Sequence, residues 1–237
     1  MELSGNSLRQ EIKYKIFIKD IGILYSWIYS HSNFSRSFED RSVNSLYYDT
    51  SNYDFAASNM SGESKRIKVR ARWYTKLEEE FLRGFMSPSK DFNFEVKRKH
   101  NSLSDKLLIG TVKTNSADNY IQRLDLLYSG LKDFQSERPV LNGLDLIDTV
   151  FINYQREYYE DILSPNLRLT IDKNINYAKS KPFNKLILLS KDYIIVELKF
   201  NPSDRGEVEK LMRNFPFRQV RSSKFLAALS QIKQVSY

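Results

Sequence analysis

The chain has 237 residues, of which 41% are hydrophobic, enough to fill the core of a domain and too many for a chain that is disordered throughout. It contains no cysteine and only two histidines, which excludes disulfide frameworks, thiolate metal sites and histidine-rich metal clusters. The 37 Lys and Arg residues outnumber the 29 Asp and Glu residues, and the resulting net charge of +8 favours anionic ligands.

The composition predicts a single cytoplasmic domain. No stretch reaches the roughly 18 consecutive apolar residues of a membrane span, and the N-terminal residues lack the basic and then apolar order of a secretory signal. Linker-like stretches are scarce and no internal repeat occurs, so residues 1–237 are expected to fold as one unit.

The first half of the chain alternates between polar and apolar residues in several segments, which predicts strands. In residues 11–16, Glu11 and Lys13 alternate with apolar neighbours, and apolar spacing of three and four then predicts a helix over 21–29. In residues 66–74 the even positions from Arg66 to Arg72 are all cationic, while the odd positions are apolar. A further strand is predicted over 94–99.

The second half repeats this combination of strands and helices. A helix is predicted over 119–134, strands over 150–160, 167–172 and 194–200, and helices over 205–214 and 224–232. Asp204 and Glu207 have the spacing of a capping box at the start of the third helix. These elements together predict an α+β domain, mainly antiparallel, with at least seven strands.

The cationic faces of these strands have two interpretations. A half-buried sheet with its polar face in water is the ordinary one. However, four like charges on one face of a strand repel one another, so several such strands favour a bound polyanion between them. A closed barrel with these faces turned inward would form a cationic tunnel.

Other sources of chemistry are few. The sequence has neither a G-x-x-x-x-G-K-[ST] loop nor a G-x-G-x-x-G motif, so phosphate would be held by side chains. It also lacks the G-x-S-x-G elbow of serine hydrolases. Aromatic residues interleaved with basic ones leave RNA binding open as an alternative.

Eight short motifs occur in the order found in the triphosphate tunnel metalloenzyme (CYTH-like) superfamily, and they resemble its VTC (vacuolar transporter chaperone) branch. Each motif alone is weak, but eight in order are specific. They are RQEIKY at 9–14, SLYYDT at 45–50, KVRARWY at 68–74, EVKRK at 95–99, NYQRE at 153–157, LRLTID at 167–172, VELK at 196–199 and SSKF at 222–225.

The resemblance implies an antiparallel β-barrel of about eight strands with flanking helices, enclosing a basic tunnel. It implies a polyphosphate polymerase, in which ATP or another nucleoside triphosphate gives its terminal phosphoryl group to a growing polyphosphate chain. The implied ligands are a nucleoside triphosphate and polyphosphate, with no nucleic acid. A membrane-embedded partner, and with it a position at the inner face of the membrane, is left open, as is the oligomeric state.

The resemblance also implies roles for individual residues. The catalytic set that would hold the triphosphate and the acceptor chain is Lys13, Arg70, Arg72, Lys97, Arg156 and Lys224. Further phosphate contacts would come from Tyr154, Arg168, Lys199, Ser223 and Lys99. Glu197 would be the main ligand of Mn²⁺ or Mg²⁺, with Glu11 as a second ligand or as an ion-pair partner of Lys13 or Arg72.

The sequence departs from the resembled families in three places. Hydrolytic members carry E-x-E-x-K on the first strand, whereas the first of these positions is Arg9 here, which favours holding a chain over hydrolysing it. An inorganic triphosphatase and a non-catalytic polyphosphate-binding module therefore remain alternatives to the polymerase. Lys99 stands where eukaryotic members tend to have histidine. Residues 76–88 take the place of a short turn, and this longer stretch would cover one mouth of the tunnel. Arg168 and Asp172 are alternatively a structural pair.

Overall fold

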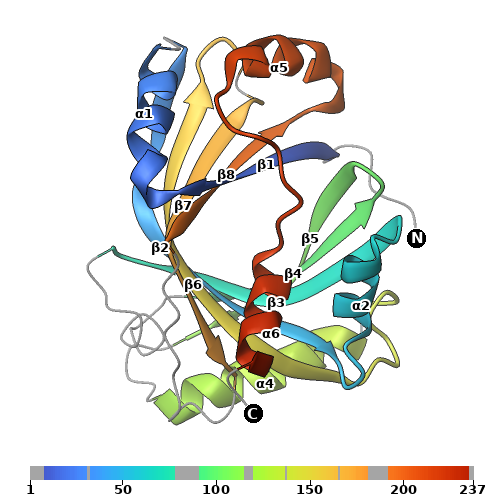
Figure 1. Ribbon diagram of the computed structural model, residues 1–237. Coiled ribbons are helices and arrows are strands. Elements are labelled where there is room, and N and C mark those ends of the chain that lie inside the picture. The colour runs from blue at the N-terminus through green and yellow to red at the C-terminus, as the bar shows by residue number, and fades with distance from the viewer. Residues whose placement is uncertain are drawn as a thin grey trace.

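Eight antiparallel strands form a closed barrel in the order β1-β5-β4-β3-β2-β6-β7-β8 (Figure 1). The computed structural model describes residues 8–30, 33–77, 91–114, 120–136, 138–164, 166–180 and 192–234. The strands are β1 (Arg9–Phe17), β2 (Phe34–Thr50), β3 (Lys65–Thr75), β4 (Asp91–His100), β5 (Leu103–Lys113), β6 (Leu146–Asp161), β7 (Arg168–Lys179) and β8 (Tyr193–Phe200). The predicted fold class, an eight-stranded antiparallel barrel with flanking helices, is confirmed.

Helices cover the wall of the barrel and enter its bore. They are α1 (Ile21–Ser30), α2 (Asp54–Ser61), α4 (Tyr120–Ser136), α5 (Arg205–Leu211) and α6 (Lys224–Gln234), with short 3₁₀ turns at η2 (Ile18–Asp20), η3 (Pro202–Asp204) and η4 (Met212–Asn214). No helix in the described part of the chain combines the length and the apolar composition needed to cross a membrane.

The apolar faces of the strands point outward, toward the flanking helices. On one side, Val69 and Trp73 of β3 belong to a buried cluster with Leu127 and Leu131 of α4. On the other side, inward-facing residues of α1 join apolar residues of β1, β7 and β8 in a second cluster. Because side chains alternate along a strand, packing the apolar positions against helices turns the charged positions into the bore.

The bore itself is divided between apolar and charged parts. A third buried cluster joins the apolar face of α6 to inward-facing side chains such as Ile152 of β6 and Ile175 of β7. At the start of α6, the ring of Phe225 stacks on that of Tyr47 with their centroids 5.1 Å apart. Figure 1 shows α6 (red) within the outline of the ring. Helix α6 therefore fills one part of the bore and leaves the charged side chains around the rest.

The C-terminal segment also closes a seam in the barrel. Strand β1 pairs with β5 only at Arg9 and Gln10, so most of this edge of β1 has no strand beside it. The segment that leads into α6 covers part of it: Tyr14 forms an isolated bridge with Gln219, and the backbone N–H of Val220 donates to the carbonyl of Lys13 over 2.8 Å. Figure 1 shows this segment running across the opening from α5 to α6.

Several details differ from the expectations of the sequence. Asp204 is the N-cap of α5 but makes no side-chain capping hydrogen bond, because the preceding turn η3 already leads the backbone into the helix. The helix predicted over 205–214 ends at Leu211 and continues as η4. Strands β2 and β5 and helix α2 were not predicted. The tunnel cover predicted over 76–88 lies outside the described residues from position 78 onward.

Candidate functional site: a cationic cavity in the barrel

The charged part of the bore contains a cavity of about 310 Å³. Three carboxylates line it, Glu11, Glu197 and Asp105, together with far more cations. The cationic side chains of the lining are Arg9, Lys13, Lys68, Arg70, Arg72, Lys97, Lys106, Arg156, Lys199 and Lys224. The convergence of the cationic strand faces that the sequence predicts is therefore present in the structure.

Eleven of the thirteen predicted site residues line this cavity. They are Lys13, Arg70, Arg72, Lys97, Arg156, Lys224, Tyr154, Lys199, Ser223, Glu197 and Glu11. Arg168 and Lys99 lie outside the lining. Arg168 is largely exposed and its Nε donates to Glu160 over 2.8 Å, so it forms no structural pair with Asp172.

Arg70 and Arg72 of β3 form one side of the site. Arg70 donates through Nε and a terminal nitrogen to Oε2 of Glu95, at 2.9 and 2.8 Å, and also contacts the hydroxyl of Tyr47. Nε of Arg72 is buried, has no hydrogen-bond partner in the described part of the chain, and lies 3.8 Å from Glu95. An unsatisfied buried guanidinium donor at the cavity wall is a ready contact for an anion.

Asp172 of β7 anchors the cations on the opposite side. Its carboxylate, fully buried, accepts a bidentate pair from Arg156 at 2.6 and 2.8 Å and an ion pair from Lys224. Both cations also lie over the ring of Tyr154, at 5.1 and 4.8 Å from its centroid. Although burial would raise the pKa of Asp172, Arg156 and Lys224 hold it below its ordinary value, so the group stays ionised.

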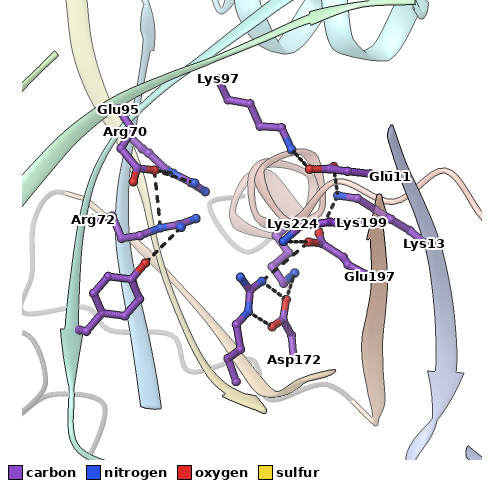
Figure 2. A network of polar contacts seen from close by, with 12 residues as sticks. Glu11, Lys13, Arg70, Arg72, Glu95, Lys97, Asp172, Glu197, Lys199 and Lys224 are labelled. Carbon is purple, nitrogen blue, oxygen red and sulfur yellow. Dashed lines mark hydrogen bonds and ion pairs between the residues drawn. The ribbon is translucent and has the colours of Figure 1, made fainter. Parts of the chain in front are cut away.

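Glu197 and Glu11 share the ammonium group of Lys13. Lys13 Nζ lies 2.8 Å from Glu197 and 3.9 Å from Glu11, while Glu197 also contacts Lys199 at 3.0 Å and Glu11 pairs with Lys97. Burial alone would raise the pKa of both carboxyls, but the neighbouring ammonium groups lower it below the usual range. Figure 2 shows this group facing Arg70 and Arg72 across the cavity.

Glu197 and Glu11 offer the kind of ligand that a hard divalent cation prefers. Carboxylate oxygens suit Mn²⁺ and Mg²⁺, and these two groups lie on adjacent strands, with Lys13 opposite Glu197 in the register. Within the described ranges, no group of three or more acidic or histidine side chains could hold a metal ion. A divalent cation held by these two carboxylates would take its remaining ligands from other oxygens, such as those of a bound phosphate.

The start of α6 adds a second source of positive potential. Ser223 Oγ accepts hydrogen bonds from Lys68 Nζ at 2.8 Å, Asn59 Nδ2 at 3.2 Å and the backbone N–H of Leu226 at 3.3 Å. Because the first turn of a helix carries a positive partial charge, anions are stabilised beside it. Ser223 and Lys224 bring that end to the cavity.

Within the SLYYDT motif at 45–50, Tyr47 lines the cavity, whereas Asp49 supports the site from outside it. The buried carboxylate of Asp49 accepts backbone N–H groups of Thr50, Phe55 and Ala56, at 2.8 to 2.9 Å, and so holds the first turn of α2. Helix α2 in turn carries Asn59, which contacts Ser223. Asp49 is therefore structural and acts on the cavity through α2, while Tyr47 of the same motif contacts Arg70 in the cavity itself.

Sequence reasoning missed seven cavity residues, which are Arg9, Tyr47, Lys68, Ser104, Asp105, Lys106 and Phe225. Lys68 occupies an even-numbered position of β3, like Arg70 and Arg72. The alternation of polar and apolar residues in this strand was therefore enough to predict that its side chain faces the bore. Arg9 occupies an odd-numbered position of β1, like Glu11 and Lys13, so its side chain lies on the same face of the strand as theirs. Tyr47 and Lys106 lie on β2 and β5, where alternation is weak, and had no comparable signal.

Lys68 makes anion binding depend on pH. Burial, together with the charges of Lys13 and Lys97, holds its pKa well below the ordinary 10.5. A bound phosphate would raise the pKa of Lys68. At a pH between the pKa in the free protein and the pKa in the complex, phosphate binding is therefore accompanied by uptake of a proton by Lys68. Affinity for inorganic triphosphate is expected to fall as the pH rises through this window, by up to about tenfold per pH unit.

A calorimetric pH series checks this expectation. Lys68→Arg, which keeps the charge at all these pH values, should flatten the profile. Lys65→Arg is the matched control, because Lys65 lies exposed on the opposite face of the same strand. A profile for Lys68→Arg as steep as that of the unmodified protein would assign the dependence to another group.

Comparison with known proteins places this cavity in a family. The family model described as the VTC domain matches residues 8–233, nearly the whole chain. The chain belongs to the VTC domain family. No curated protein matches it in sequence.

Two solved structures share the fold of this VTC domain. One is the Hippeastrum protein HpAC1, an adenylyl cyclase candidate described as having a dominant triphosphatase activity, with 12% identity, 95% coverage of both chains and a TM-score of 0.54. The other is an adenylate cyclase candidate from Vibrio parahaemolyticus, with 12% identity, a TM-score of 0.51, and coverage of 93% of this chain and 98% of that one. The barrel is therefore a triphosphate tunnel fold.

Proposed function

We propose that this VTC domain is a metal-dependent polyphosphate polymerase, which transfers the terminal phosphoryl group of ATP to the end of a polyphosphate chain in the cavity. The observation that carries the proposal is the convergence of ten cationic side chains on one cavity in the bore, against three carboxylates in the lining that the described residues form. So large an excess of positive charge matches a ligand with several adjacent negative charges.

The first strand favours transfer to a chain over transfer to water. Arg9, which replaces the first acid of the hydrolytic E-x-E-x-K pattern, lines the cavity itself. A cation at this position adds a contact for phosphate and removes a carboxylate that would help to activate water. The cavity thus holds two glutamates, Glu11 and Glu197, beside a continuous set of phosphate-binding groups.

The residues of the cavity suit phosphoryl transfer. The bond between the terminal phosphorus and its bridging oxygen breaks, a terminal oxygen of the chain bonds to that phosphorus, and ADP leaves. This oxygen is already ionised, so no general base is required. The protein contributes position and charge: Arg70 and Arg72 of β3, together with Arg156 of β6 and Lys224 of α6, would hold the reacting phosphates in line.

A divalent cation completes this proposal. Glu197, with Glu11 beside it, would hold Mn²⁺ or Mg²⁺ together with substrate oxygens, and the metal would supply charge neutralisation on the phosphates. Lys13 and Lys199, which contact Glu197 in the ligand-free site, would then turn to phosphate oxygens.

A synthesis assay tests the proposal. Purified protein incubated with ATP and Mn²⁺ is expected to release ADP and to form acid-labile chains that lengthen with time. Release of inorganic phosphate without chains would contradict polymerase activity and would support the triphosphatase, which the described activity of the structurally similar Hippeastrum protein makes the second candidate. Chain-length-dependent binding without turnover would identify a binding module.

A further inference from the structure

The inward face of β3 and β4 continues beyond the cavity in a ladder of opposed side chains. In the register of the two strands, Arg70 lies opposite Glu95, Lys68 opposite Lys97, and Arg66 opposite Lys99. The first pair is neutralised by its own ion pair. The next two pairs place like charges directly opposite each other, an arrangement that destabilises a sheet unless an anion lies between them.

Carboxylates compensate only part of this ladder. Glu11 pairs with Lys97, but within the described ranges no carboxylate lies at ion-pair distance from Arg66 or Lys99. Nε of Arg66 is moreover buried without a hydrogen-bond partner in that part of the chain. A half-buried pair of cations with an orphaned guanidinium donor is costly in the free protein.

The electrostatic surroundings of Lys99 connect this pair to the cavity. Burial lowers the pKa of Lys99 and the nearby charges of Arg66 and Lys97 lower it further, while the charge of Glu11 offsets part of this change. Lys97 itself lines the cavity. The Arg66–Lys99 pair therefore follows the Lys68–Lys97 pair in a row of basic side chains, the basic track, which leaves the cavity along β3 and β4.

The spacing of the track separates two classes of ligand. Arg66 is four residues from Arg70, which is about 13 Å along an extended strand. A triphosphate centred between Arg70, Arg72 and Arg156 would leave Arg66 and Lys99 without an anion, whereas a longer chain could lie along all three rungs. We propose that Arg66 and Lys99 form a second anion subsite, which holds the part of a polyphosphate chain that extends from the cavity; this assignment rests on the proposed function.

Calorimetric titrations with two probes test the subsite. The double variant Arg66→Gln/Lys99→Gln is expected to bind medium-chain polyphosphate about tenfold more weakly than the unmodified protein, because two charge-assisted contacts are lost. Its affinity for inorganic triphosphate should change by less than about twofold, since that ligand does not reach the pair. The matched control is Lys65→Gln/Lys113→Gln, which removes two exposed cations from β3 and β5 and should leave both affinities unchanged.

The folding of the double variant is checked by its melting temperature, which should not fall, because two opposed like charges are removed. Equal losses for triphosphate and polyphosphate would overturn the proposal, as would unchanged binding of polyphosphate. A loss seen only with a single-stranded RNA oligonucleotide would assign the pair to nucleic acid and would also overturn it. Failure of the proposed function is distinguishable, since the unmodified protein would then form no chains from ATP in the synthesis assay, whatever the affinities of the double variant.

Discussion

Replacing Glu197 with Gln is expected to lower the rate of phosphoryl transfer about a thousandfold while triphosphate binding without metal becomes tighter. The amide keeps the shape of the side chain but removes the negative charge that would hold a divalent cation. It also releases Lys13 and Lys199, which the carboxylate holds at 2.8 and 3.0 Å, so that both ammonium groups become available to phosphate. The opposite signs of the two effects separate a metal ligand from a phosphate-binding residue.

The measurement pairs a turnover assay with Mn²⁺ and a titration with triphosphate in the presence of a chelator. Glu160→Gln is the control, because Glu160 pairs with Arg168 outside the cavity lining and should leave both quantities unchanged. Retention of turnover by Glu197→Gln would exclude a metal role for this residue. Parallel losses of binding and turnover would instead indicate that Glu197 organises the cations.

Replacing Asp172 with Asn is expected to destabilise the ligand-free protein by about 3 kcal/mol, because two cations then lose their buried partner. Asp172 is fully buried and pairs with Arg156 and Lys224, neither of which has another carboxylate closer than 3.8 Å among the described residues. For a chain of this size, the melting temperature should fall by about 6 to 12 °C.

Triphosphate should restore much of this loss. Its oxygens would supply Arg156 and Lys224 with the negative charge that the amide lacks, so the rise in melting temperature on adding triphosphate is expected to be larger for Asp172→Asn than for the unmodified protein. Glu209→Gln, which breaks an exposed pair with Arg205 on α5, is the control and should cost less than about 1 kcal/mol. Identical ligand-induced shifts in Asp172→Asn and the unmodified protein would show that bound phosphate does not approach Arg156 and Lys224.

Both experiments address one feature of the ligand-free cavity. Its cations are held by carboxylates: Arg70 by Glu95, Arg156 and Lys224 by Asp172, Lys13 by Glu197 and Lys97 by Glu11. These pairs let the fold enclose many like charges without a ligand. We infer that a polyphosphate competes with them for the same cations and that binding is therefore sensitive to each carboxylate.

The sequence by itself determined which face of each strand is charged. Successive side chains of a strand point to opposite sides, so alternate positions share one face. This alternation alone predicted that one set of charged residues faces the same bore, and the set includes Lys13, Arg70, Lys97, Arg156 and Glu197. The order of eight weak motifs also indicated the family that the match over residues 8–233 confirms. These properties are local, or depend only on order along the chain.

Tertiary structure decided how far along the bore each charge lies and what it contacts. Arg168 lies on the predicted face of β7. However, the offset between neighbouring strands places it outside the cavity, where it pairs with Glu160. The amphipathic pattern of α6 was compatible with packing on the outer wall, but the unpaired edge of β1 accepts the preceding segment and the helix enters the bore. Ion-pair partners such as Asp172 and Lys224 lie 52 residues apart, and only closure of the barrel brings them together.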